Sequence, residues 1–218
     1  MISTKKYRFL RPAGAARFLV GVAALLALAA PALAQTFAPG DFCTYTQGGW
    51  GAVPQGNNPG TILNDNFSTV FGGFVEVGIP ESAGYSMQFT SAAAIRDYLP
   101  AGRKPMPLDM DYTNPTSTKS GVFGGQVLAL QLNVDLDSAF GGLVINGTGT
   151  SFDTMTVGQV LDAANQALGT PTAGYTLPSD LNDLVSFLNQ GFDNCLPSGW
   201  AQQYLTAGDG PPPLPDPV

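Results

Sequence analysis

The class of fold depends on one apolar segment, Val122-Phe-Gly-Gly-Gln-Val-Leu-Ala-Leu-Gln-Leu-Asn-Val-Asp-Leu136. From residue 128 onward, apolar residues alternate with small or polar ones, which predicts a strand. Apolar residues also recur at helical spacing from 122 to 134, and Gln, Leu and Ala are good helix formers. Gly124 and Gly125 would cost a helix about 1–2 kcal/mol in total, although glycine also permits close helix packing. The pattern alone favours helix and strand equally.

On either side of this segment, the sequence predicts one hairpin and four further helices. Residues 74–77 and 85–89 alternate with period two, which predicts a small β-hairpin. Apolar residues recur at helical spacing in the predicted helices, 61–71, 92–99, 157–168 and 180–195. Expected N-cap residues precede three of them: Thr90 or Ser91, Thr156, and Ser179 or Asp180. Gly/Pro-rich loops are expected at 35–59, 100–119 and 141–149, and a short turn at 200–205.

The first 34 residues have the parts of a secretory signal peptide. A basic region, an apolar run from 18 to 30 and Pro31-Ala-Leu-Ala34 predict cleavage near Ala34. The apolar run is shorter than the roughly 20 residues that span a bilayer, and we expect no transmembrane segment in the mature chain. We therefore expect a secreted or periplasmic protein with a single globular domain over 35–207. Five prolines in 208–218 predict a disordered or polyproline-like tail.

Cleavage changes the charge of the protein. Five of the nine basic residues lie in the signal, so the mature chain has four against 16 acidic residues, a formal net charge of −12. Such a surface repels phosphate backbones and anionic lipids, which argues against nucleic-acid and peripheral membrane partners. The four remaining basic residues are Arg96, Arg103, Lys104 and Lys119. They form either a local patch for an anion or acidic glycan or, as we favour, solubilising charge on a loop.

The two cysteines, Cys43 and Cys195, lie near the two ends of the expected domain. In an oxidising compartment they most simply form one disulfide bond. Two free thiols or an intermolecular bond are the alternatives at this point.

Four segments together resemble a family of secreted bacterial domains. They are Cys43-Thr-Tyr-Thr-Gln-Gly-Gly-Trp50-Gly, Asn57-Asn58-Pro59-Gly60, Gly125-Gln-Val-Leu-Ala-Leu-Gln-Leu-Asn-Val134 and Phe192-Asp-Asn-Cys195. That family opens with Cys and Thr-Gln-Gly-x-Trp, continues with Gln-x-x-x-Ala/Leu-x-Leu-Asn-Val and ends near a second Cys. Its members occur alone or within large surface proteins and have no established activity. The resemblance covers 41 to about 200. It implies a buried helix at 126–134, a Cys43–Cys195 bridge and no catalytic residue.

Catalytic chemistry is limited by composition, because the chain has no histidine. Ser-His-Asp and Cys-His nucleophiles and His general bases are excluded. A carboxylate hydrolase needs two Asp/Glu about 5–10 Å apart. Close pairs exist at Glu76 with Glu81 and at Asp109 with Asp111. Such pairs occur in any acidic protein, so a small carboxylate-dependent hydrolase is our second alternative.

No cofactor is expected, although oxygen ligands leave a structural calcium ion open. Asn64-Asp65-Asn66, Asp109-Met-Asp111 and Asp135-Leu-Asp137 each place oxygens two residues apart. None has the glycine and distal glutamate of an EF-hand loop. Helix caps and solvated surface explain most of them.

Aromatic and amide residues gather near the start of the mature chain, at Trp50, Tyr45, Gln47, Asn57 and Asn58. Ring faces that stack on sugars and amides that bind hydroxyls are typical of glycan sites. The alternative, which we favour, is that Trp50 plugs the core beside Cys43.

These observations predict an α+β, mainly helical domain with about five helices, a small β-hairpin and Gly/Pro-rich loops, closed by one disulfide. We expect an exported, non-catalytic structural or interaction domain of the cell surface or extracellular matrix. The expected partner is a cell-surface component or a polysaccharide. The first alternative is a glycan-binding module that uses the Trp50 loop.

Overall fold

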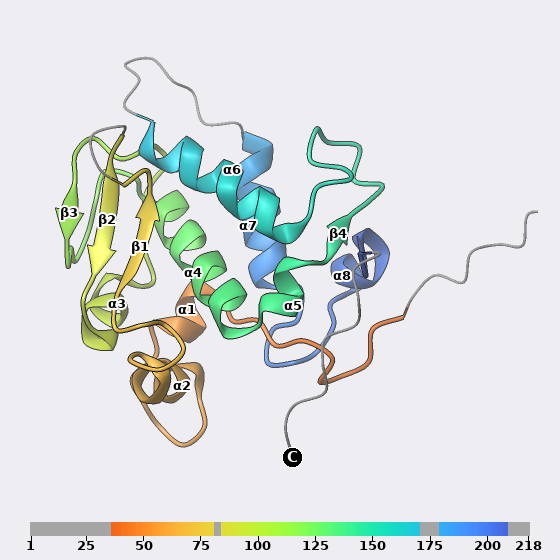
Figure 1. Ribbon diagram of the computed structural model, residues 1–218, viewed down its shortest axis with the longest axis horizontal. Helices are drawn as coiled ribbons and strands as arrows, with labels where there is room; N and C mark the ends of the chain where they lie inside the picture. Colours follow the sequence, from red (N-terminus) through yellow and green to blue (C-terminus); the bar gives the residue numbers. More distant parts are fainter. Residues whose placement is uncertain (1–35, 81–83, 171–178, 209–218) are drawn as a thin grey trace, which may run out of the picture. The chain divides into compact units, whose positions relative to one another are not determined.

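The computed structural model describes residues 36–80, 84–170 and 179–208, and these contain eight helices and five short strands. The helices are α1 (Gln47–Trp50), α2 (Pro59–Asn66), α3 (Ala92–Tyr98), α4 (Val122–Leu136), α5 (Ser138–Gly141), α6 (Val157–Gly169), α7 (Ser179–Asn189) and α8 (Gly199–Tyr204). The strands are β1 (Val75–Gly78), β2 (Ser86–Phe89), β3 (Tyr112–Thr113), β4 (Val144–Ile145) and β5 (Leu205–Thr206). The fold is therefore α+β, and helices form most of its regular structure (Figure 1).

The ambiguous segment is a helix, α4, which contacts α6, α7 and β1 (Figure 1). Nine of its 15 residues are buried. A helix that is apolar on all sides has to be surrounded by other elements, because it has no face to present to water. The same property explains why its sequence shows no clear amphipathic period. The strand alternative is wrong.

The two glycines of α4 let neighbouring chain approach the helix closely. A Cβ atom at Gly124 would lie 2.5 Å from the hydroxyl oxygen of Tyr98, and one at Gly125 would lie 2.8 Å from Cβ of Ala101. Neither distance occurs between real atoms of these kinds. The packing gained at these positions offsets the low helix propensity of glycine.

The predicted hairpin is confirmed by β1 and β2, which pair antiparallel with Val75 opposite Phe89. Strand β3, which lies inside an expected loop, adds to β2 in parallel with Tyr112 opposite Met87. Helices α4 and α6 both contact β1 and cover one side of this three-stranded sheet (Figure 1). The central helix, the hairpin and α6 thus enclose one core.

Two predicted helices end earlier than expected. Helix α2 stops at Asn66, whose carbonyl oxygen accepts hydrogen bonds from the N–H groups of residues 69, 70 and 71 in a series of turns. Helix α7 stops at Asn189. The hydroxyl of Thr44 donates to the carbonyl oxygen of Asn189 and accepts the N–H of Phe192, and these two bonds replace further helical ones. Apolar spacing continued past both ends, so it did not reveal these stops.

The prediction of about five helices corresponds to the five longest helices of the structure, and three further ones are present in its described part. These are α1, α5 and α8, of four to six residues each. One turn of helix is too short for a hydrophobic period to be recognised. Their N-caps are nonetheless regular: Thr46, Asp137 and Ser198 each accept a backbone N–H at the start of the helix.

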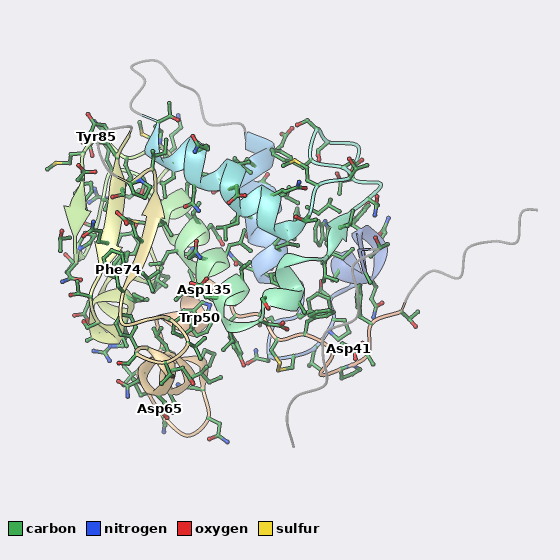
Figure 2. All side chains as sticks on the ribbon, viewed as in Figure 1. Asp41, Trp50, Asp65, Phe74, Tyr85 and Asp135 are labelled. Atoms are coloured by element: carbon green, nitrogen blue, oxygen red, sulfur yellow. A yellow bond between two sulfur atoms is a disulfide. The ribbon has the colours of Figure 1, made fainter. Side chains whose placement is uncertain are left out.

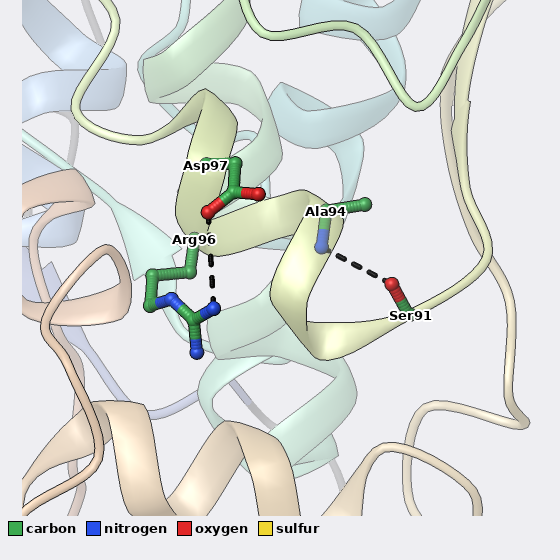
Figure 3. Close-up of polar contacts among 4 residues, drawn as sticks. All are labelled: Ser91, Ala94, Arg96 and Asp97. Atoms are coloured by element: carbon green, nitrogen blue, oxygen red, sulfur yellow. Dashed lines mark hydrogen bonds and ion pairs between the residues drawn. The ribbon is translucent and has the colours of Figure 1, made fainter.

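Of the expected N-caps, two are confirmed. Ser91 accepts the backbone N–H of Ala94 at 3.1 Å and begins α3 (Figure 3). Thr156 begins α6 in a reciprocal capping box with Gln159.

The ends of the described chain are held together by a disulfide between Cys43 and Cys195, 152 residues apart. Intramolecular pairing is confirmed, and both cysteines are used. The N–H groups of Gly40 and Thr44 bond the carbonyl oxygens of Cys195 and Phe192 beside it. A second, two-stranded sheet pairs β5 antiparallel with β4, which attaches the end of the described chain to its middle.

The predicted signal peptide (1–34) and all but the first residue of the predicted tail (208–218) lie outside the described residues. None of the described helices is long and apolar enough to cross a membrane.

Candidate functional site

The aromatic centre of the predicted glycan site is buried. Trp50 is the last residue of α1, and its side chain is 0% exposed where α1 contacts α4 (Figure 2). The indole Nε1 donates a hydrogen bond to Oδ1 of Asn133 at 3.1 Å. The ring packs edge-on against Tyr45 and Phe71, with centroids 5.0 and 6.0 Å away. In this position neither face of the ring is open to a ligand.

Asn133 is the centre of a buried hydrogen-bond network. Its Oδ1 also accepts the backbone N–H of Tyr45 at 2.8 Å. Its Nδ2 donates to the carbonyl oxygen of Tyr45 at 3.0 Å and to Oδ1 of Asn189 at 2.9 Å. Both donors and both lone pairs of this amide are therefore used, which is the condition under which a polar group can be buried without penalty.

The network continues through Asn189 to the first turns of α4. Nδ2 of Asn189 donates to the carbonyl oxygen and to Oε1 of Gln126, at 3.0 and 2.8 Å. Three of the four segments that carry the family resemblance, 43–51, 125–134 and 192–195, thus meet in and beside one buried network. Their polar residues bond one another and hold the fold.

The amides of the predicted site have separate structural tasks. Oε1 of Gln47 accepts the backbone N–H of Ala101 at 2.9 Å. Oδ1 of Asn58 caps α2 by accepting the N–H of Thr61 at 2.9 Å. Asn57 is exposed. Because Trp50, Tyr45 and Gln47 lie in the interior, the five residues do not form one surface.

The carboxylate pairs are also used by local structure. Glu76 accepts hydrogen bonds from the side chains of Ser86 and Gln88, at 2.6 and 3.0 Å, across the hairpin. Glu81 lies outside the described residues. Asp111 accepts the backbone N–H of Ser86 at 2.9 Å.

The three candidate calcium segments are occupied in similar ways. Asp137 caps α5, Asp109 accepts the Tyr112 hydroxyl at 2.7 Å and Asn66 bonds back to the carbonyl oxygen of Ile62. Within the described residues, no group of three or more His, Cys, Asp or Glu side chains is placed to hold a metal ion. A calcium site therefore stays an untested prediction.

An aromatic surface that the sequence reasoning missed lies on α7 and α8. It consists of Phe187, Trp200 and Tyr204. Phe187 is 45% exposed and stacks on Trp200, with ring centroids 5.5 Å apart and planes 11° from parallel. Tyr204 lies one turn beyond Trp200 in α8, and the ring centroids of these two residues are 5.6 Å apart. We call these three residues the aromatic surface.

Two signals in the sequence point to this surface. Phe187 does not belong to the apolar face of its helix, which is formed by Leu181, Leu184, Val185 and Leu188, all buried. Trp200 and Tyr204 are four residues apart, the spacing that places side chains on one side of a helix. An aromatic residue on the polar side of an amphipathic helix is the feature to search for.

Comparisons of this chain with protein-family models, with curated proteins and with solved structures gave no match.

Proposed function

We propose that this protein is an exported, non-catalytic interaction domain of the cell surface or extracellular matrix, with residues 35–207 as one domain that follows a cleaved signal peptide. The signal-like segment at 1–34 and the disulfide support export, because disulfides form in oxidising compartments. The family resemblance to secreted bacterial domains supports the same placement. The contact surface in this proposal is the aromatic surface on α7 and α8.

The stack of the exposed Phe187 on the partly buried Trp200 is the observation that carries the proposal. Single exposed apolar residues are ordinary, but adjacent aromatic rings that reach the surface favour contact with a partner. Tyr, Trp and Phe are enriched where proteins bind other molecules, because they offer large contact areas at small entropic cost.

The helix that carries Trp200 and Tyr204 is fixed by packing and by a hydrogen-bonded cap. Ala201, between Trp200 and Tyr204, is 0% exposed, and Ser198 caps α8 by accepting the N–H of Ala201 at 3.1 Å. Helix α8 also contacts α7 and leads directly into β5. A surface on rigid elements presents its rings in one arrangement and loses little freedom on binding.

Glycan binding is the second candidate function. Because Trp50 is buried, we place the glycan site on the aromatic surface instead. Exposed amides lie near these residues in the chain: Gln203 donates to the Tyr204 hydroxyl at 2.9 Å, and Gln190, one turn beyond Phe187, donates to Ser186. Ring faces beside amide donors suit the apolar faces and hydroxyls of sugars. The acidic net charge of the mature chain favours a neutral glycan here.

The test is binding of the exported protein to glycan arrays and to isolated cell envelopes. Phe187→Ala is compared with Phe74→Ala, a matched control because both phenylalanines are 45% exposed. Phe74 precedes β1, on the sheet side of the fold (Figure 2). Binding that is lost in Phe187→Ala and Trp200→Ala but kept in Phe74→Ala supports the proposal. Equal binding by all three variants, or no binding by the unchanged protein, contradicts it.

A further inference from the structure

A pocket lies between the end of α3 and the start of α4, away from the aromatic surface. Its volume is about 140 Å³, and its lining residues come from two chain segments, 98–103 and 116–121, without Leu99, Lys119 and Ser120. This is close to the size of an engineered cavity of about 150 Å³ that accommodates benzene, so one six-membered ring is of a suitable size. The pocket is independent of the function proposed above.

The walls of the pocket are fixed by close backbone approaches. Gln47 holds the backbone of Ala101 through the hydrogen bond described above. The carbonyl oxygen of Arg103 accepts the N–H of Val122, the first residue of α4, at 3.3 Å. Gly121 lies so near the carbonyl of Lys104 that no side chain would fit between them. A pocket held in this way needs little rearrangement to bind a ligand.

Hydroxyl groups form one side of the pocket. The hydroxyls of two lining residues, Tyr98 and Thr118, are buried and bond each other at 3.1 Å. Both also bond the buried hydroxyl of Ser120, which does not line the pocket, at 3.3 Å and 2.6 Å. Three hydroxyl hydrogens suffice for these three contacts, so lone pairs on the Tyr98 and Thr118 oxygens are left to accept from a ligand. Thr116 and Ser117 are exposed lining residues that add two more hydroxyls.

The only charged side chain among the lining residues is a cation, Arg103. Of the basic residues in the described chain, Arg96 pairs with Asp97 at 3.8 Å (Figure 3), and Lys119 also pairs with an aspartate. Within the same residues, no ion pair involves Arg103 or its neighbour Lys104. An unpaired arginine at a pocket stands out in a mature chain with a net charge of −12.

We propose that this pocket binds a sugar acid, that is, a hydroxylated six-membered ring that carries a carboxylate. The planar guanidinium of Arg103 can donate two parallel hydrogen bonds to a carboxylate, which an ammonium group cannot do. The hydroxyls of Thr116, Ser117 and Thr118 bond the ring hydroxyls of the ligand. The sugar acid is either free in the medium or the terminal residue of an acidic glycan, since both offer the same groups.

The experiment is an NMR titration of the exported protein with D-glucuronate, with methyl glucoside and inorganic phosphate as reference probes. We expect glucuronate to shift amide signals from 98–103 and 116–121, and methyl glucoside to leave them unchanged. D-Galacturonate and an oligogalacturonate are titrated in a parallel arm, as monomer and oligomer of the same sugar acid. Tighter binding of the oligomer than of the monomer assigns the ligand to an acidic glycan, and equal binding assigns it to the free sugar acid.

Arg103→Gln is compared with Arg96→Gln, which removes the same charge outside the pocket. We expect Arg103→Gln to weaken glucuronate binding at least about tenfold, or about 1.4 kcal/mol, and Arg96→Gln to leave it within about twofold. Thermal unfolding checks that both variants fold. Arg103→Lys keeps the charge and is expected to restore binding only in part. The proposal is overturned if glucuronate shifts no pocket signal, if phosphate binds in its place, or if the two glutamine variants behave alike.

Discussion

Trp50 and Asn133 are 83 residues apart in the chain, and the indole N–H of one donates to the side-chain oxygen of the other at 3.1 Å. The same oxygen accepts the backbone N–H of Tyr45. The side-chain amide of Asn133 on α4 therefore binds both Trp50 and the backbone of Tyr45, just before α1. This bond joins the two most distinctive motifs of the sequence in the interior of the fold.

Asn133→Ala is expected to lower the free energy of unfolding by about 3 kcal/mol or more. It leaves the Trp50 indole N–H and the Tyr45 N–H buried without an acceptor, and each such group costs about 1–3 kcal/mol. Urea denaturation measures the change. Gln131→Ala on the same helix is the control, expected to stay within about 0.5 kcal/mol because its side chain bonds only the exposed Asp135. A similar loss in both variants would contradict the central role of Asn133.

Trp50→Ala is expected to destabilise the protein by about 3–5 kcal/mol, the usual cost of removing a large buried aromatic side chain. Trp200→Ala should cost less, because Trp200 is only partly buried. Thermal unfolding of the two variants gives the comparison. A folded Trp50→Ala protein with unchanged stability that has lost ligand binding would instead return the glycan site to the Trp50 loop.

Gly124→Ala should destabilise the protein by about 1–3 kcal/mol through overpacking. In an exposed helix the same change usually stabilises by up to about 1 kcal/mol, so the sign is diagnostic. The added methyl group would meet Ser120 and the Tyr98 hydroxyl. Gly48→Ala in α1 is the matched control, since the nearest atom to its Cβ would be 3.8 Å away. Chemical denaturation of both variants measures the change in the free energy of unfolding. A stabilised Gly124→Ala protein would contradict the close packing described at this position.

Replacing both Cys43 and Cys195 by serine is expected to lower the free energy of unfolding by about 2–5 kcal/mol. The bond closes a loop of 152 residues, for which the chain-entropy account gives roughly 4–5 kcal/mol as an upper value. Denaturant titrations with and without a reducing agent measure the loss. The double variant should not respond to the reducing agent. If the reducing agent also destabilised the double variant, its effect on the unchanged protein could not be assigned to the Cys43–Cys195 bond.

Stability is expected to fall in alkali, in part through Tyr98. Burial raises the pKa of Tyr98 above its ordinary value of 10.0, although hydrogen bonds from Ser120 and Thr118 lower it somewhat. At a pH between the ordinary pKa of 10.0 in the unfolded chain and the raised pKa in the folded protein, Tyr98 keeps its proton only in the folded protein. The contribution of Tyr98 to the free energy of unfolding is therefore intact below about pH 10 and is lost as the pH rises through the folded pKa.

Tyr98→Phe tests this contribution. It should cost about 0.5–1.5 kcal/mol at neutral pH through the lost hydrogen bonds and reduce the decline of stability above pH 10. Burial also raises the pKa of Tyr45 and Tyr112, so part of the decline should persist. Denaturant titrations from pH 8 to 11 on both proteins provide the measurement. An identical decline in the variant would rule out a contribution from Tyr98.

Local patterns were sufficient for most of the secondary structure. The hairpin and the helices α2, α3, α6 and α7 follow from hydrophobic periods within each element, and α3 and α6 also from the cap residues that precede them. Patterns of this kind did not reveal α1, α5 and α8, which are too short to show a period. They also did not reveal β4 and β5, because these two-residue strands form only by pairing across the intervening residues 146–204, Val144 with Thr206 and Ile145 with Leu205.

The candidate sites were harder to predict than the fold. Trp50 beside amides looks like a binding loop until Asn133 is known to lie against it. The pocket and the aromatic surface each combine segments that are separate in sequence, 98–103 with 116–121 and α7 with α8. Residues that are brought together only by packing leave no joint pattern in the chain.

The sequence by itself determined the mixed class of the fold and the approximate positions of the hairpin and of α2, α3, α6 and α7, because composition and hydrophobic period are local properties. Tertiary structure decided that the two cysteines bond each other. The hydrophobic period of 122–136 left helix and strand open, since a segment buried on all sides shows no preference for one period; the family resemblance implied a helix, and the tertiary structure has one there. Tertiary structure also decided that the Trp50 motif is internal and that Arg103 faces a pocket, because burial and ion pairing depend on which distant segments lie beside a residue.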